Sequence, residues 1–167
     1  RGTVDPNEAC GECDYCRHER PHFCPNMIDH GILVDGGLAE FAKAGEKAVY
    51  KLPDGVSLIE GSFTELLSCC VQGINRAQIR VGESVGVFGG GPAGQILHQL
   101  ASVAGAGKVS LFTHSEEKLK LAASLGADVT INYVTQDFEE EVNGATNGVG
   151  ANVILDGIGG EVFEKSI

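Results

Sequence analysis

Residues 84–94 read SVGVFGGGPAG, a short apolar run followed by glycines and the start of a second apolar stretch. A short, mostly apolar run that ends at a glycine-rich turn is typical of a buried strand. Pro92 fits the first turn of a helix, where a missing N–H costs nothing. The pattern G-x-G-x-x-G at Gly89, Gly91 and Gly94 therefore falls between a strand and a helix, as a dinucleotide-binding turn requires.

Each position of this turn has an expected task. Gly89 would permit the tight turn, Gly91 would let the backbone approach a pyrophosphate, and Gly94 would allow close packing of helix against strand. Pro92 and Ala93 open a helix whose N–H groups and dipole would face an anion. We predict that these five residues bind the cofactor. A glycine-rich turn with no ligand is the alternative.

Apolar runs and helical stretches alternate on the C-terminal side of this turn. Further strands are predicted at 108–112, 129–132 and 151–155, and helices at 93–104, 115–125 and 135–146. A β-α-β-α-β-α-β order predicts an α/β fold with a doubly wound parallel sheet, here partial and Rossmann-like. The expected strand order is third, second, first, fourth, which leaves 151–155 as an apolar edge.

The end of the second predicted strand bears on the choice of cofactor. An NAD site usually has Asp or Glu there, to bind the ribose 2′-OH. This chain has Thr113-His114-Ser115 instead. Hydroxyls and an imidazole suit a 2′-phosphate, so Thr113 and His114 are predicted to contact the cofactor. The pattern favours NADP, and NAD stays open.

The first fifty residues show no helical periodicity. Strands are predicted at 37–44 and 47–52, and the Pro53-Asp54-Gly55 turn follows. Ser57 with Glu60 three positions on forms a predicted capping box, and apolar residues at helical spacing extend one helix, or two short ones, to Ala77.

Four cysteines in this region have metal-ligand spacing. Cys10, Cys13, Cys16 and Cys24 place four thiolates on a segment with little apolar content. Tetrahedral zinc would close its shell with four thiolates, which predicts a structural rather than a catalytic site. Disulfides would need an oxidising compartment, and an iron–sulfur cluster would have three rather than seven residues before its last cysteine. His18 and His22 lie inside the loop and are expected to be solvated or to lie outside the ligand set.

Composition limits the possible partners. The chain of 167 residues has 12 Lys and Arg against 23 Asp and Glu, a formal charge of −11. Such a charge repels a phosphate backbone, so nucleic-acid binding is not expected. No apolar run reaches the roughly 18 residues of a membrane span, and the N-terminus does not look like a signal peptide. We expect a cytoplasmic protein.

Several motifs together resemble one family. They are VDPNEACGECDYC with the later Cys24, DGGLAEF, VYKLPDGVS, TELLSC, GGGPAG and EEKLKLAASLGAD. Their order is similar to that of the zinc-containing medium-chain dehydrogenases, especially the polyol (sorbitol) dehydrogenase branch. The resemblance implies part of a GroES-like domain with the zinc lobe at 1–52, a linking helical segment at 53–82 and part of a Rossmann domain at 83–167. It also implies an oxidoreductase in which a catalytic zinc polarises an alcohol or polyol while hydride passes to NAD or NADP.

Three more residues acquire roles by this resemblance alone. Glu65 in TELLSC matches a glutamate that approaches or ligates the catalytic zinc, although the branch usually has Pro where this chain has Leu66. Cys69 would lie near the nicotinamide, and Lys118 would contact the adenosine ribose. The alternatives are a solvated helix carboxylate for Glu65, a small buried hydrophobe for the Cys69–Cys70 pair and an exposed helix lysine for Lys118.

The chain also departs from the family. The first catalytic zinc ligands would precede Arg1, and two further Rossmann strands would follow residue 167. We therefore expect an inactive internal fragment of a homodimeric or homotetrameric enzyme. Two other functions stay open: a non-catalytic module that binds dinucleotide and zinc, and a zinc-free quinone or enoyl reductase on the same fold.

Overall fold

The computed structural model describes residues 1–166. The chain divides into two compact units, Arg1–Glu65 and the part from Leu66 onward. Each unit is described by itself.

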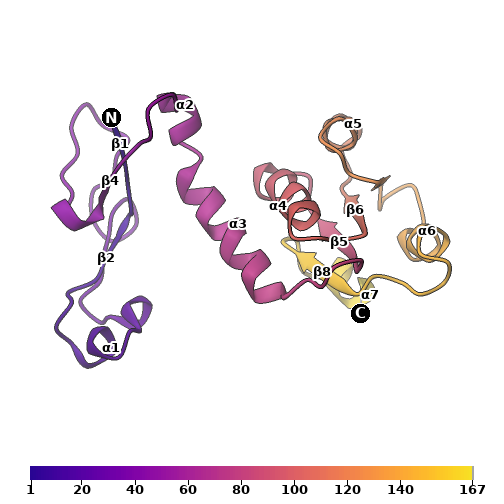
Figure 1. Ribbon diagram of the computed structural model, residues 1–167, viewed down its shortest axis with the longest axis horizontal. Coiled ribbons are helices and arrows are strands. Elements are labelled where there is room, and N and C mark those ends of the chain that lie inside the picture. Colours follow the sequence, from indigo (N-terminus) through magenta and orange to yellow (C-terminus); the bar gives the residue numbers. More distant parts are fainter. Residues whose placement is uncertain (167) are drawn as a thin grey trace. The chain divides into compact units, whose positions relative to one another are not determined.

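The second unit is built on a four-stranded parallel sheet (Figure 1). Its strands are β5 (Ser84–Phe88), β6 (Lys108–Phe112), β7 (Val129–Ile131) and β8 (Val153–Asp156). Their order is β7-β6-β5-β8, with every neighbouring pair parallel. The α/β class and the expected strand order are confirmed. The fourth strand begins two residues later than predicted and extends to Asp156, at the same edge as the end of β5.

Helices cover both faces of this sheet. They are α4 (Pro92–Val103), α5 (Glu116–Ser124), α6 (Phe138–Ala145) and α7 (Glu161–Ser166), preceded by α3 (Thr64–Ala77). On one face, side chains of β5 and β6 pack against Ala101 of α4 and Ala122 of α5. On the other, Phe88 and Phe112 stack with ring centroids 4.1 Å apart, and Phe138 of α6 meets both edge-on. The sheet is thus doubly wound.

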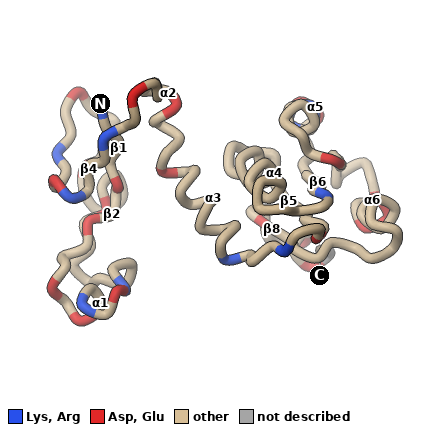
Figure 2. The backbone as a smooth tube through the Cα atoms, in the orientation of Figure 1, with Lys and Arg blue, Asp and Glu red and all other residues tan. Residues whose placement is uncertain are grey.

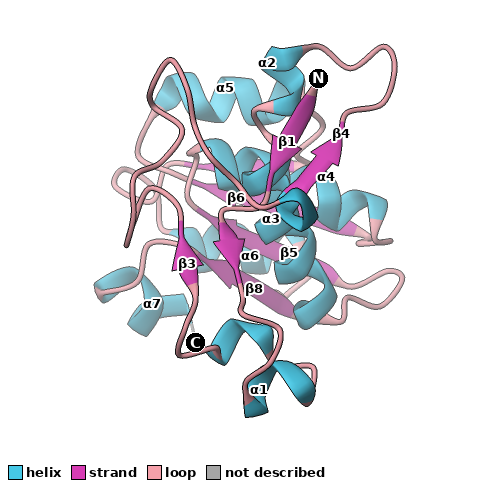
Figure 3. Ribbon diagram, turned by 90° about the vertical axis from the view of Figure 1, so that its left-hand side faces the viewer, coloured by secondary structure: helices cyan, strands magenta, loops and turns pink. Residues whose placement is uncertain are grey.

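The first unit is made of short strands. β1 (Gly2–Val4) pairs antiparallel with β4 (Val49–Lys51), as Figure 3 shows, and β2 (Asn7–Glu8) pairs with β3 (Ile28–Asp29). Helical turns complete it: α1 (Asp14–Arg17), α2 (Leu58–Gly61), and 3-10 helices at Pro21–Phe23 and Glu46–Ala48. Ser57 caps α2 in the predicted capping box with Glu60, and two helices rather than one, the single turn α2 and the longer α3, extend to Ala77.

One predicted strand is wrong. Residues 37–44 form no strand, because no segment of the described chain offers them a ladder of hydrogen bonds. Leu38 and Phe41, the two large apolar side chains of this segment, are 108% and 90% exposed. The neighbouring prediction at 47–52 is confirmed only for Val49–Lys51, since Glu46–Ala48 turn as a 3-10 helix.

Charged residues are spread unevenly over the elements. The α4 helix carries no charged side chain and is tan throughout in Figure 2, whereas α6 begins with Glu139, Glu140 and Glu141. Among the residues described, no helix is long and apolar enough to cross a membrane.

Candidate metal and cofactor sites

The four predicted zinc ligands converge. Ligand atoms of Cys10, Cys13, Cys16 and Cys24 all lie within 4.8 Å of one another. A tetrahedron with Zn–S bonds of about 2.3 Å needs sulfur atoms about 3.8 Å apart, so the cluster fits a four-thiolate zinc site. α1 supplies Cys16, and the 3-10 helix ends just before Cys24.

Main-chain N–H groups surround these sulfurs. The N–H of Cys13 donates to Cys10 Sγ at 3.4 Å, and that of Cys10 donates to Cys24 Sγ at 3.4 Å. N–H donors from Glu12 and Cys13 lower the pKa of Cys10 to about 6, whereas burial and the Cys13 side chain raise that of Cys16 to about 12. The backbone therefore already favours negative charge at Cys10.

The lobe around the cysteines has almost no core of its own. Between residues 10 and 27 only Cys24 is buried. His18 is exposed, and its Nδ1 lies 2.8 Å from the main-chain oxygen of Asp14, outside the sulfur cluster. A bound metal would supply the ordering free energy that burial does not, on the order of 10 kcal/mol for structural zinc.

The glycine-rich turn occupies the end of β5. Gly89 has a φ of 117°, a conformation that favours glycine, and its N–H donates to the oxygen of Phe112 at 2.8 Å. A Cβ on Gly94 would meet the Gly89 oxygen at 1.7 Å, so the helix lies directly on the turn. A Cβ on Gly91 would meet nothing within 4 Å. The open space beside Gly91, at the N-terminus of α4, is where a pyrophosphate fits.

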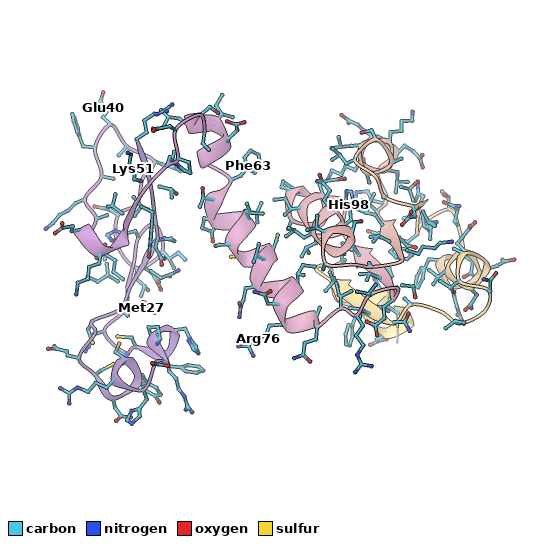
Figure 4. All side chains as sticks on the ribbon, viewed as in Figure 1. Met27, Glu40, Lys51, Phe63, Arg76 and His98 are labelled. Atoms are coloured by element: carbon cyan, nitrogen blue, oxygen red, sulfur yellow. The ribbon has the colours of Figure 1, made fainter. Side chains whose placement is uncertain are left out.

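A buried polar pair, absent from the sequence-based prediction, connects this turn to α5. Gln95 donates from Nε2 to the oxygen of Lys118 at 3.0 Å and to that of Gly90 at 3.4 Å. Its Oε1 lies 3.2 Å from Nε2 of His98, which is fully buried on α4 and labelled in Figure 4. Burial lowers the pKa of His98, so it stays neutral at pH 7. The pair holds the glycine-rich turn at a fixed distance from the N-terminal end of α5. The sequence did offer a signal for this pair, because Gln95 and His98 are polar residues within the otherwise apolar helix α4.

The carboxyl ends of β6 and β7 meet beside the turn. Thr113 is buried, with its side chain facing Gly90, where a Cβ would come within 2.8 Å of it. His114 is exposed, and its Nδ1 lies 3.2 Å from the hydroxyl of Tyr133, which follows β7. Sequence reasoning missed Tyr133, although a residue just after the third parallel strand shares this edge of the sheet. Lys118 lies in the first turn of α5, and its N–H donates to the Ser115 hydroxyl at 3.5 Å.

The remaining predicted residues lie on α3. Glu65 lines a cavity of about 270 Å³ together with His30, Asp35 and Lys43 of the first unit. Cys69 is exposed, whereas its neighbour Cys70 is buried, with Sγ 3.7 Å from the oxygen of Ala93. Cys70 thus contacts the start of α4. Among the described residues, the four cysteines are the one group of three or more potential metal ligands that converges, and Glu65 is not in it.

Comparison with known proteins finds the same family that the sequence motifs resemble. Residues 92–167 match the family model described as zinc-binding dehydrogenase. This part of the chain is similar to the zinc-binding dehydrogenases. The resemblance drawn from the sequence is confirmed, including its polyol branch, since curated relatives are named for polyols and polyol phosphates.

Two curated relatives and one solved structure illustrate what this chain is similar to. D-arabitol-phosphate dehydrogenase of Enterococcus avium is 32% identical over 90% of this chain and 44% of its own length. Alcohol dehydrogenase of Geobacillus stearothermophilus is 34% identical over 95% of this chain and 46% of its own length. A zinc-binding dehydrogenase from Sinorhizobium meliloti 1021, solved bound to NADP, is 35% identical with a TM-score of 0.83, covering 92% of this chain and 46% of that one. The chain spans less than half the length of these relatives.

Proposed function

We propose that this chain supplies the dinucleotide-binding and structural-zinc parts of an NAD(P)-linked dehydrogenase that oxidises a small alcohol or polyol. The observation that carries the proposal is the glycine-rich turn, whose one open glycine, Gly91, faces free space at the N-terminus of α4. The names of the relatives, an alcohol and a polyol-phosphate dehydrogenase, support the substrate class. We extend the proposal to a cytoplasmic, homodimeric or homotetrameric parent protein.

The residues of the turn would act by position and charge. Free N–H groups and the dipole of α4 favour a pyrophosphate beside Gly91. The hydrogen bonds of Gln95 fix the position of Gly90 relative to Lys118, so one dinucleotide can contact both the glycine-rich turn and α5. A bound nicotinamide supplies the hydride acceptor. The cysteine cluster would take no part in the reaction, because four thiolates leave zinc no open position.

Glu65 is our candidate for the neighbourhood of the catalytic zinc. Its place beside a cavity shared with His30 and Asp35 supports this role. Glu65 would help to hold a zinc ion there, and that ion would supply Lewis-acid polarisation of the alcohol oxygen. Because the described residues bring no two further ligands to Glu65, we expect this chain alone to bind cofactor without turnover.

Calorimetry on the purified, zinc-loaded chain tests the proposal. We expect one tightly held zinc per chain and saturable binding of NADP, NAD or ADP-ribose. The matched control is Gly91→Ala, which keeps the fold and fills the cofactor space. A folded chain that binds none of the three compounds would contradict the proposal.

A second function is a non-catalytic module that binds a dinucleotide. The single converging ligand group among the described residues favours it. An assay of the full-length parent protein separates the two functions. Alcohol-dependent reduction of NAD or NADP supports the enzyme, and tight cofactor binding without turnover supports the module. Absence of zinc after gentle purification would instead favour a zinc-free reductase.

A further inference from the structure

The acidic residue nearest to the end of β6 already accepts a hydrogen bond within the chain. Glu116, at the start of α5, accepts a hydrogen bond from Nδ2 of Asn132 at 2.6 Å. NAD sites use a carboxylate near this position to bind the ribose 2′-OH. In this chain that carboxylate is instead directed toward the residue that follows β7.

Asn132 is firmly held in that position. It is 6% exposed, and its Oδ1 accepts from the N–H of Val134 at 3.2 Å. Its own N–H donates to Oε1 of Gln136 at 2.9 Å, and Nδ2 also lies 3.5 Å from the oxygen of His114. A buried amide with its donors and acceptor used resists rotation, because rotation would leave polar atoms unpaired. The bond to Glu116 is therefore a stable feature of this edge.

Polar and basic groups occupy the exposed side of the same edge. The rings of His114 and Tyr133 meet edge-on, with centroids 6.1 Å apart at 75°, and their polar atoms lie 3.2 Å apart. This contact fixes the direction of both side chains. An imidazole and a phenol hydroxyl can both donate to a phosphate oxygen, and hydrogen bonds to ionised oxygens are the stronger ones.

We propose that the Asn132–Glu116 bond, together with the His114–Tyr133 pair, makes this site select NADP over NAD. The bond withdraws the carboxylate that would repel a 2′-phosphate, and the pair receives that phosphate. The inference rests on the proposed dinucleotide binding and adds to it a cofactor choice and two residues, Asn132 and Tyr133.

The test compares affinities for NADP, NAD and ADP-ribose by calorimetry. The wild type should bind NADP at least about tenfold more tightly than NAD. Asn132→Leu frees Glu116, and the ratio of the two affinities should shift about tenfold toward NAD. Adding Glu116→Gln removes the freed charge and should restore the ratio. Glu116→Gln alone is the matched control and should leave the preference for NADP in place.

Two exposed-edge variants keep the test valid if Asn132→Leu does not fold. His114→Asn and Tyr133→Phe should each weaken NADP severalfold and leave NAD unchanged. A wild type that prefers NAD, or a ratio that none of the variants moves, overturns the inference while the proposed function stands. Failure of all proteins to bind even ADP-ribose overturns both.

Discussion

Two glycines in the same turn should respond in opposite ways to one added methyl group. Gly91 has φ −72° and ψ −179°, an ordinary extended conformation, and open space where its Cβ would lie. Gly94 has no such space, because a Cβ would come within 1.7 Å of the Gly89 oxygen. Alanine at Gly91 should thus be harmless to the fold, and alanine at Gly94 should force the turn open.

The sizes of the two effects follow from these contacts. An alanine that fits reduces the entropy of the unfolded chain and adds about 0.4–1 kcal/mol to the free energy of unfolding. Overpacking against a backbone atom that cannot move aside costs about 1–3 kcal/mol or more. Both glycines lie in the second unit, which starts at Leu66. In a domain of about 100 residues, a change of 1 kcal/mol in the free energy of unfolding shifts the melting temperature by about 4–8 °C. Gly91→Ala should therefore melt slightly higher, and Gly94→Ala lower by about 5 °C or more.

Binding should separate the variants further. In Gly91→Ala the new methyl group occupies the space proposed for the pyrophosphate, so affinity for ADP-ribose should fall at least about tenfold, or 1.4 kcal/mol. The assay is a thermal melt followed by calorimetric titration of the same sample. If Gly91→Ala is folded and binds ADP-ribose as tightly as the wild type, the placement of the pyrophosphate is wrong. If Gly94→Ala melts like the wild type, the contact with Gly89 is not as close as described.

Three further outcomes are expected. Cys16→Ser should lose zinc and become sensitive to protease between residues 10 and 28, because the lobe has no core; undiminished zinc by mass spectrometry would contradict this. Burial lowers the pKa of His98 in the folded chain. His98 has a pKa of about 6.5 in the unfolded chain, so below that pH the unfolded chain binds more protons than the folded one. The free energy of unfolding therefore falls as the pH drops through that value. His98→Leu should show a smaller loss of melting temperature between about pH 7.5 and 5.5 than the wild type, and an equal loss would refute the assignment. Ser57→Ala removes the α2 cap and should cost about 1 kcal/mol, measured by urea unfolding; no shift in midpoint would argue against the cap.

Much of the sheet was predictable because its signals are local. The apolar runs of β5 and β6 and the turn at Gly89 need only their own residues to be recognised. The strand predicted at 37–44 failed for the complementary reason. A strand needs a partner strand as well as suitable residues, and the described chain contains none for this segment.

In the candidate sites too, features that depend on neighbouring residues were predictable, and features that depend on distant partners were not. The spacing of Cys10, Cys13, Cys16 and Cys24 within one short segment predicted a cluster that the structure brings together. Gln95 and Asn132 could not be assigned, because their roles depend on partners 23 and 16 residues away, across helices and strands. The place of Glu65 depends on residues that no local pattern connects to it.

The cysteine cluster has a consequence for the order of folding. Its ligands span Cys10 to Cys24, a separation of 14 residues, whereas Ser84 of β5 bonds Asn152 across 68 residues. Short loops close at lower entropic cost and faster than long ones. We expect the lobe to capture metal while the parallel sheet is still open, during synthesis as well as in refolding. In stopped-flow refolding, thiolate-to-cobalt absorbance should therefore rise before the circular dichroism of the helices, and the reverse order would contradict this.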